Sequence, residues 1–206
     1  DAAFEVVEGP CAGRRIAIGG AADALGVADA ALGDDGFLVK TVGADLAILG
    51  GKRGVIYGAY ELLERLGCRF FTATCERVPT ATTLPLPDLD IREVPRLEYR
   101  EHNYGEFTRY SRFAVKSRIN GHFAPIREKH GGAMKYAKWF VHTFDALVPQ
   151  SIYGETHPEY FSMVGGKRLV ARHRSQLCLT NRDVLDIATE SVRSALLANP
   201  QARTVS

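Results

Sequence analysis

The stretch GVIYGAYELLERLG, residues 54–67, decides how the first part of the chain folds. Apolar side chains recur in it three and four residues apart, which is the spacing of one helix face. We therefore predict a helix over residues 54–66 with this buried set: Val55, Ala59, Leu62, Leu63 and Leu66. The charged residues Glu61, Glu64 and Arg65 are expected on the other side. Gly67 follows the last apolar residue, and a glycine at that position is a common helix end.

Short apolar runs lie on both sides of this helix and predict strands. Arg15–Ile18, Gly36–Val42 and Asp45–Leu49 precede it, and Cys68–Phe71 follows it. Gly43-Ala44 is a two-residue connector with glycine first, which suits a type II′ hairpin. We expect the strands of residues 15–71 to form a sheet with the helix packed on one face.

The composition of the 206 residues is that of a globular protein, with 46% hydrophobic and 24% charged residues. Disorder and coiled coil are excluded, and no apolar run approaches the roughly 20 residues of a membrane span. The sequence starts at Asp1 without a signal-peptide core, so we expect it to begin partway into its gene product. The net charge of +2 is too small to indicate nucleic acid as a partner.

Two regions differ in composition. Residues 1–96 hold 10 basic and 14 acidic side chains, whereas residues 97–206 hold 16 and 10, together with all 6 histidines. Between them, residues 76–96 are interrupted by four prolines, which favour an extended crossing segment. We predict a small α/β domain over residues 1–94 and a second domain over residues 95–206.

Strand-like and helix-like stretches alternate in the second region, a pattern typical of βα units and a parallel sheet. Strands are expected at Leu97–His102, His122–Ile126 and Trp139–Leu147, and helices at 106–119 and Asn181–Leu197. A complete (β/α)8 barrel takes about 250 residues, so this region has length for the first βα units only. The predicted fold class is α/β, with an accessory domain followed by the front of an incomplete barrel.

Polar residues at the ends of these strands are the candidate binding site. Arg100, His102 and Asn103 lie at the end of the first expected strand, and His142 and Asp145 at the end of the third. Barrel active sites form at the C-terminal ends of strands, and the guanidinium fork suits sugar hydroxyls or a carboxylate. The alternative for Arg100 is an ion pair with a neighbouring glutamate, Glu98 or Glu101, and the alternative for His142 is a structural histidine.

Other motifs favour structural roles. LGGKRG, residues 49–54, lacks the order of a phosphate-binding P-loop, so Lys52 and Arg53 are expected in a solvated turn. Thr156 and Glu159 have the spacing of a capping box, and TNRD, residues 180–183, has the composition of a helix start.

Metal and cofactor sites are not expected. The histidines have no short ligand spacing, and the cysteines form no CxxC pair. We expect buried free thiols at all four cysteines, with a Cys68–Cys75 bridge as an alternative in an exported protein. The four are Cys11, Cys68, Cys75 and Cys178.

These residues resemble known families. The helix stretch followed by a proline-rich crossing into PRLEYRE resembles the front of family 20 and family 67 glycoside hydrolases. In family 20 the first barrel strand carries a Pro-x-x-x-Tyr-Arg pattern, which Pro95, Tyr99 and Arg100 match. The strings HTFDALVP, HPEYFSMVGGKR and QLCLTNRDVL are similar to domain of unknown function 4838, some members of which are classed in glycoside hydrolase family 163.

The resemblance implies an endo-β-N-acetylglucosaminidase-like enzyme acting on glycans that contain N-acetylhexosamine, with export of the parent protein. In families 20 and 163 an adjacent Asp-Glu pair after the fourth barrel strand performs substrate-assisted catalysis. This sequence contains no Asp-Glu dipeptide, so no catalytic residue is assigned and the chain alone is expected to be inactive. The expected partner is an oligosaccharide, and the alternative function is a non-catalytic carbohydrate-binding or interaction module.

Overall fold

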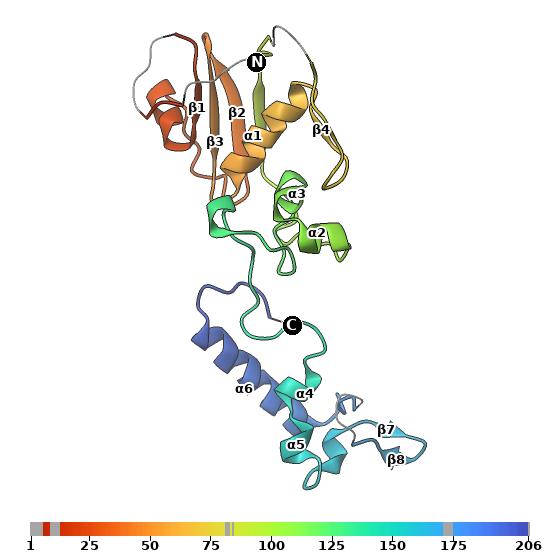
Figure 1. Cartoon of the computed structure of the whole chain (residues 1–206). Coiled ribbons are helices and arrows are strands. Elements are labelled where there is room, and N and C mark those ends of the chain that lie inside the picture. The colour runs from red at the N-terminus through yellow and green to blue at the C-terminus, as the bar shows by residue number, and fades with distance from the viewer. Residues whose placement is uncertain (1–5, 9–12, 81–82, 84, 171–174, 206) are drawn as a thin grey trace. The chain divides into compact units, whose positions relative to one another are not determined.

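The computed structural model describes residues 6–8, 13–80, 83, 85–170 and 175–205. Two compact units make up the chain, Asp1–Ala133 and Met134–Ser206, and each is described by itself (Figure 1). Residues beyond the composition change, up to Ala133, pack with the first unit. The domain boundary between residues 94 and 95 stays a prediction.

A four-stranded sheet forms the centre of the first unit. Its strands are β1 (Ile16–Ile18), β2 (Phe37–Val42), β3 (Asp45–Gly50) and β6 (Asp90–Glu93), in the order β1-β3-β2-β6. β1 runs parallel to β3, and the other pairs are antiparallel. The β2–β3 hairpin turns at Gly43, which has a φ of 61°, while Ala44 keeps a negative φ. This combination of signs is the one that the predicted type II′ turn requires.

The helix α1 (Gly54–Arg65) lies across one face of this sheet, as predicted (Figure 1). Alternate side chains of β2 and β3 point to it, because successive residues of a strand face opposite sides. The buried cluster on this face contains Phe37, Val39, Leu46, Ile48, Tyr57, Leu62, Leu89, Ala114, Val115, Ala124 and Ile126. A smaller cluster, which includes Ala47, packs with the 3-10 helix η1 (Gly19–Leu25).

The buried face of α1 differs from the prediction. It contains Gly54, Tyr57, Gly58, Glu61 and Leu62. Leu62 is buried as expected and Val55, Ala59 and Leu66 are half-buried, but Leu63 is 39% exposed and its predicted burial is wrong. The two glycines bring the backbone close to the sheet, because a Cβ at Gly58 would lie 2.8 Å from Cγ2 of Ile48.

Glu61 is buried rather than exposed because its carboxylate binds two arginines, Arg65 at 2.9 Å and Arg118 at 2.7 Å. The end of α1 is as predicted. Gly67 has a φ of 96° and donates to the Glu64 carbonyl, while the amide of Cys68 donates to the Leu63 carbonyl at 3.0 Å. These two bonds form a Schellman motif, which satisfies carbonyls that the helix end would leave unpaired.

The stretch after α1 forms a strand but does not join the main sheet, which corrects the prediction. β4 (Arg69–Phe70) pairs with β5 (Glu76–Arg77) in a separate hairpin. One edge strand of the main sheet is β6, which lies inside the segment expected to be only an extended crossing.

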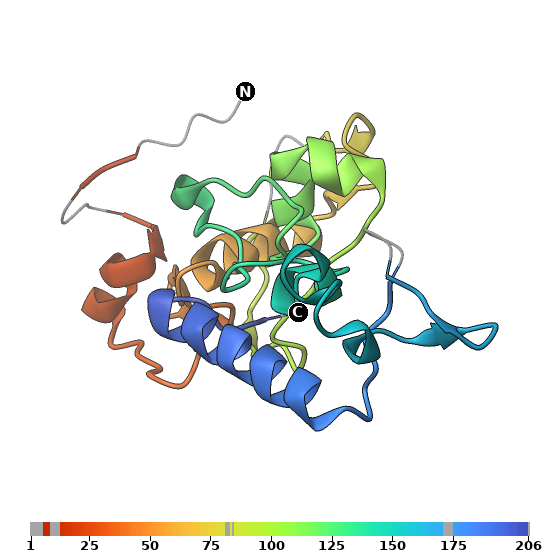
Figure 2. The ribbon, with the colours of Figure 1, turned by 90° about the horizontal axis from the view of Figure 1, so that it is seen from below.

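Short helices follow the crossing segment. α2 (Gly105–Arg109) and α3 (Ser111–Lys116) replace the single predicted helix, because Tyr110 between them has a non-helical φ of −114° and ψ of 88°. A 3-10 helix, η2 (Glu128–His130), comes later in the same unit. Figures 1 and 2 both show the β4–β5 hairpin beside α2 and α3.

The strands expected at residues 97–102 and 122–126 do not form. Side chains satisfy the backbone groups that a neighbouring strand would have bound. The amide of Arg100 donates to Oδ1 of Asn120 at 2.8 Å, and the amide of His122 donates to the Tyr99 hydroxyl at 3.2 Å. The backbone is therefore held in irregular loops.

The second unit consists of short helices, one hairpin and one long helix. Its elements are α4 (Phe144–Leu147), α5 (Gln150–Tyr153), η3 (Pro158–Tyr160), β7 (Met163–Val164), β8 (Lys167–Arg168) and α6 (Arg182–Ala198). Its core contains Leu147, Val148, Tyr160, Phe161, Leu177 and Val184. The strand expected at 139–147 is wrong, because Val141 and His142 have positive φ values of 44° and 53°, which an extended strand does not allow.

Of the two predicted helix starts in this unit, one is confirmed. Oδ1 of Asn181 accepts the amides of Asp183 and Val184 at 2.9 and 3.3 Å and caps α6. The capping box at Thr156 and Glu159 is wrong, since η3 begins after His157 without a side-chain cap.

The α/β class is confirmed, as a small mixed sheet with several helices. The (β/α)8 barrel stays a prediction. Among the described residues, the helices are too short or too polar to cross a membrane.

Candidate functional site

An open hollow in the first unit, which we call the aromatic hollow, has a volume of about 640 Å³. Its lining comes from the β4–β5 hairpin, α2 and α3, and consists of Phe71, Tyr104, Gly105, Glu106, Phe107, Arg109, Tyr110 and Phe113. Five of these eight residues are aromatic. The hollow therefore presents ring surface with two charged groups beside it.

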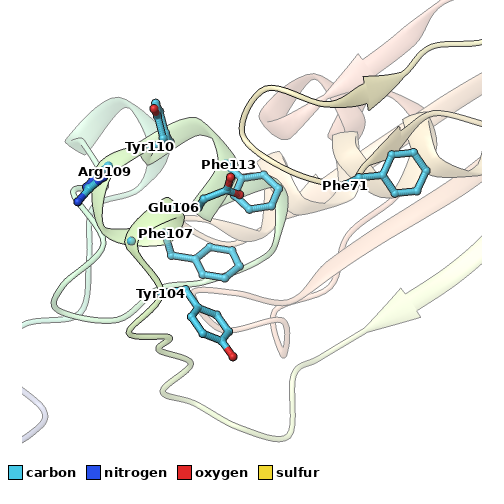
Figure 3. Close-up of a pocket in the computed structure, with 8 residues that line it drawn as sticks. Phe71, Tyr104, Glu106, Phe107, Arg109, Tyr110 and Phe113 are labelled. Carbon is cyan, nitrogen blue, oxygen red and sulfur yellow. The ribbon is translucent and has the colours of Figure 1, made fainter.

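The rings are ordered by stacking on one another. Phe107 and Phe113 are stacked with centroids 5.1 Å apart, and His102 stacks on Tyr104 at 4.1 Å. Figure 3 shows Phe113, Phe107 and Tyr104 one below the other, and Phe71 apart from them with its ring pointing away from theirs. Solvent reaches 62% of Phe71 and 68% of Tyr104. Large exposed aromatic side chains that gather around one hollow are typical of a binding surface.

Polar contacts join the two walls. The carboxylate of Glu106 accepts the amide of Ala73 at 3.3 Å, and Lys116 forms an ion pair with Glu76 at 2.6 Å. Each contact ties the hairpin to the helices. The position of the β4–β5 hairpin beside α2 and α3 is thus fixed by contacts within the unit.

A second hollow of about 710 Å³ adjoins the first, and Arg109, Tyr110 and Phe113 line both. Its remaining lining is mostly polar and basic, with Thr72, Ala73, Thr74, Glu76, Ser111, Arg112, Lys116, Pro125, Arg127, Lys129 and His130. We call it the basic hollow.

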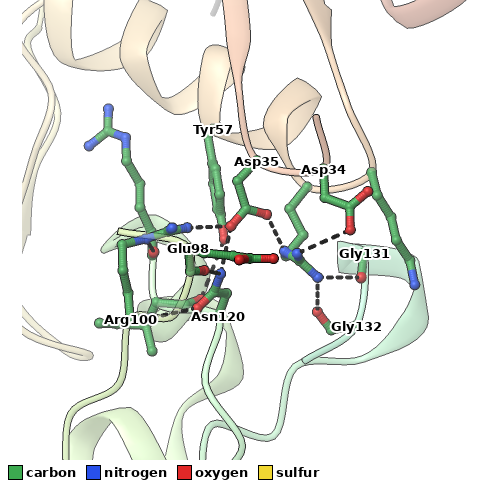
Figure 4. A network of polar contacts seen from close by, with 12 residues as sticks. Asp34, Asp35, Tyr57, Glu98, Arg100, Asn120, Gly131 and Gly132 are labelled. Atoms are coloured by element: carbon green, nitrogen blue, oxygen red, sulfur yellow. Dashed lines mark hydrogen bonds and ion pairs between the residues drawn. The ribbon is translucent and has the colours of Figure 1, made fainter. Parts of the chain in front are cut away.

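Away from both hollows, a buried polar network centres on Asp35 (Figure 4). One carboxylate oxygen accepts from the Arg53 guanidinium. The other oxygen accepts from Arg100 at 2.6 Å and from the Asn120 amide at 2.6 Å. A single carboxylate therefore connects the turn before α1 with the loops around residues 100 and 120.

The environment of Arg53 differs from the solvated turn that we predicted. Arg53 is only 5% exposed, and its Nη1 donates to the carbonyls of Gly131 and Gly132 at 3.3 and 3.2 Å. Lys52 is exposed as expected, with Glu128 at 3.8 Å. Arg53 thus holds the segment around residue 131 in place.

Arg100 has the geometry of the ion-pair alternative, although its partner is Asp35 rather than a neighbouring glutamate. Its Nε donates to the Arg118 carbonyl at 2.8 Å and its Nη1 to the Leu97 carbonyl at 2.7 Å. The guanidinium also lies 5.8 Å from the Tyr57 ring. Burial, followed by the charge of Asp35, raises the pKa of Tyr57. The role of Arg100 as a sugar contact stays a prediction.

The other candidates lie apart in the chain. His102 and Asn103 are exposed in the first unit, and His102 accepts the Tyr104 amide at 3.3 Å. His142 is exposed in the second unit. Asp145, in the same unit, accepts the Gln150 amide at 3.2 Å at the start of α5. Of the five, His102 alone contacts the aromatic hollow, through Tyr104 and Phe107.

The sequence carried a signal for the aromatic hollow that our prediction did not use. Aromatic residues stand at every third position in Tyr104, Phe107, Tyr110 and Phe113. The last three of these residues fall within the single helix predicted at 106–119. The break at Tyr110 is what leaves part of this series at the surface, with Tyr110 48% exposed.

Glu159 and the cysteines complete the predicted set. Nδ1 of His157 lies 3.0 Å from Glu159, and hydrogen bonds from the backbone and from His157 lower the pKa of Glu159.

Cys68 is buried and free, whereas Cys75 is exposed and free, which corrects the expectation of burial there. Cys178 is free and half-buried, and Cys11 lies outside the described residues. Within the described ranges, no three His, Cys, Asp or Glu side chains are grouped as metal ligands would be.

Fold and site together define an α/β protein with an aromatic hollow beside a basic one. Comparison with protein families matches residues 70–206 to the domain of unknown function DUF4838. The match covers more than half of the chain, and the chain belongs to this family. No curated protein and no solved structure matches the chain.

Proposed function

We propose that this chain binds glycan through the aromatic hollow and is the N-terminal part of a carbohydrate-active glycoside hydrolase. The observation that carries the proposal is the group of five aromatic side chains that line this hollow, of which Phe71, Tyr104 and Tyr110 are exposed (Figure 3). The C–H faces of a pyranose are apolar and its hydroxyls are polar. An open hollow with aromatic walls and charged residues at its side suits both.

The proposed substrate class is glycans that contain N-acetylhexosamine, as the family resemblance implies. Substrate-assisted hydrolysis needs a positioned general acid next to the carboxylate that orients the 2-acetamido group. Because this sequence has no Asp-Glu dipeptide, we propose that the chain supplies binding surface and that the catalytic pair lies outside it.

A second candidate is a non-catalytic carbohydrate-binding module. The lack of an Asp-Glu dipeptide favours it, and it uses the same hollow. Turnover of a glycan by the intact protein supports the hydrolase, whereas binding without turnover supports the module.

Calorimetric titration with chitotetraose, a neutral N-acetylglucosamine tetramer, tests the binding that both candidates share. Tyr104→Ala removes an exposed ring and should weaken binding about three- to tenfold, the effect of one aromatic contact. The control Phe123→Ala removes an exposed ring that does not line either hollow, and should leave affinity unchanged. Absence of measurable binding, or equal loss in both variants, would refute the proposal.

A further inference from the structure

The basic hollow contains more positive charge than its acidic groups balance. Arg109, Arg112, Arg127 and Lys129 are exposed on its lining, and none has a hydrogen bond or an ion pair from its side chain to another described residue. The remaining lysine of the lining, Lys116, is already paired with Glu76 at 2.6 Å. Four cations therefore surround one cavity of about 710 Å³ without a counterion in the part of the chain that the structure describes.

Two polar atoms of the same lining, Oγ of Ser111 and Nδ1 of His130, are buried and have no hydrogen-bond partner among the described residues. Buried polar atoms are nearly always paired in folded proteins, so two of them in one hollow need an explanation. His130 is also sensitive to the surrounding cations. Burial lowers its pKa, and the charges of Lys129, Arg127 and Arg112 lower it further.

We infer that the basic hollow binds an acidic group, a carboxylate or a sulfate ester, on the glycan that occupies the aromatic hollow. A carboxylate is planar and a sulfate ester is tetrahedral, and both present at least two oxygens that accept paired hydrogen bonds from arginine. Arg109, Tyr110 and Phe113 line both hollows, so one oligosaccharide can span them. This inference rests on the proposed function, because it names the class of glycan that the site takes.

The arrangement favours an acidic saccharide over a nucleic acid. The cations are gathered in one hollow with an aromatic wall, whereas a phosphate backbone is usually followed by a long basic stripe. The net charge of the whole chain is only +2. A local cation cluster in a nearly neutral protein matches a ligand that carries one or a few charges.

The test uses calorimetric titration of the intact protein with four probes at 150 mM salt. They are chitotetraose, unsulfated chondroitin tetrasaccharide, chondroitin sulfate tetrasaccharide and single-stranded dT12. Both chondroitin probes contain N-acetylhexosamine and carboxylates. Only the sulfated probe also carries sulfate esters, so a comparison of the two separates the effect of the sulfate from that of the carboxylate. We expect at least one of them to bind about tenfold or more tightly than chitotetraose, because a charge-assisted hydrogen bond contributes binding free energy of that size.

A pair of variants locates the effect. Arg112→Gln combined with Arg127→Gln should remove most of the difference in affinity between the acidic probe and chitotetraose. Arg96→Gln is the matched control, because Arg96 is exposed in the same unit and lines neither hollow. It should leave the affinities for both probes unchanged.

A second readout is the pKa of His130, measured by a pH titration that is monitored by NMR. An anion beside Lys129, Arg127 and Arg112 offsets their charge, so the saturating acidic probe should raise the pKa of His130, and chitotetraose should not. Equal affinities for the neutral and acidic probes, with an unmoved His130 titration, would overturn the inference while chitotetraose binding keeps the proposed function. Tighter binding of dT12 than of either acidic tetrasaccharide would also overturn it. Failure of chitotetraose to bind would instead remove the proposed function.

Discussion

Asp35 joins three segments of the first unit through one carboxylate. It accepts from Arg53, Arg100 and Asn120, and its side chain is only 11% exposed. Removing one partner of a buried ion pair leaves the other charges uncompensated, which costs about 3–5 kcal/mol.

We therefore expect Asp35→Asn to lower the free energy of unfolding by about 3–5 kcal/mol, measured by urea denaturation. Asp88→Asn is the control, since Asp88 is exposed and is expected to change stability by less than about 0.5 kcal/mol. Equal stabilities of the two variants would show that the network does not hold the unit together.

Substitution of Arg100 with lysine separates the two interpretations of its role, a sugar contact and a structural ion pair. Lysine keeps the charge beside Asp35 but cannot donate in the three directions that Nε, Nη1 and Nη2 occupy. From the geometry we expect Arg100→Lys to lower the thermal midpoint and leave chitotetraose affinity unchanged. An unchanged midpoint with weaker glycan binding would instead assign Arg100 to the sugar site.

For single residues, the sequence indicated some of the important side chains but not the partners that they bind. Arg100 stood out from its position near the end of an expected strand, yet its partner Asp35 is 65 residues away, and Asn120 is 85 residues from Asp35. Such pairings depend on the tertiary fold, and no local pattern contains them. Arg53 was expected in solvent for the same reason.

Helix α1 depends on close approach to the sheet. At Gly58 an added Cβ would meet Cγ2 of Ile48 at 2.8 Å and Cβ of Phe37 at 3.3 Å, and both neighbours are buried. Overpacking of this kind typically costs about 1–3 kcal/mol.

We expect Gly58→Ala to lower the free energy of unfolding by about 1–3 kcal/mol, even though alanine favours a helix by about 1 kcal/mol. Gly105→Ala is the matched helical glycine, since its Cβ would meet only the end of Arg109 at 3.8 Å. This control should be neutral or slightly stabilising. A stabilising Gly58→Ala in denaturant unfolding would contradict the packing described for α1.

Elements with a strong local signal were predictable from the sequence. The period of residues 54–66, the glycine after it and the Gly43-Ala44 connector are each local, and the structure has all three. The strands expected at 97–102 and 122–126 failed because their backbone groups bond to distant side chains. The burial of Glu61 was missed because its partner Arg118 lies in another segment.

On the scale of the whole molecule, the sequence predicted the α/β class and the family, while the barrel and the glycan chemistry stay predictions. Composition placed a boundary at residue 95, where the proline-rich segment ends. The segment after it nevertheless packs with the sheet as far as Ala133, because its buried residues Ala114, Val115 and Ile126 complete the core over α1.

The purified chain of residues 1–206 should not hydrolyse an aryl N-acetylglucosaminide. Substrate-assisted cleavage needs an adjacent acid to protonate the leaving group, and the sequence has no Asp-Glu dipeptide to supply it. A chromogenic assay measures this directly, with a mock purification as the control for contaminating enzymes. Turnover above that control would contradict the division between binding and catalysis.

The central claim is that glycan binds in the aromatic hollow, and an NMR titration of the protein with chitotetraose tests it most directly. We expect saturable shifts in the backbone amides that surround the hollow, at residues 71–74 and 104–113. Amides of the Asp35 network should move little, because that network is buried away from the hollow. Saturable shifts confined to other segments, or no shifts at millimolar chitotetraose, would contradict the claim.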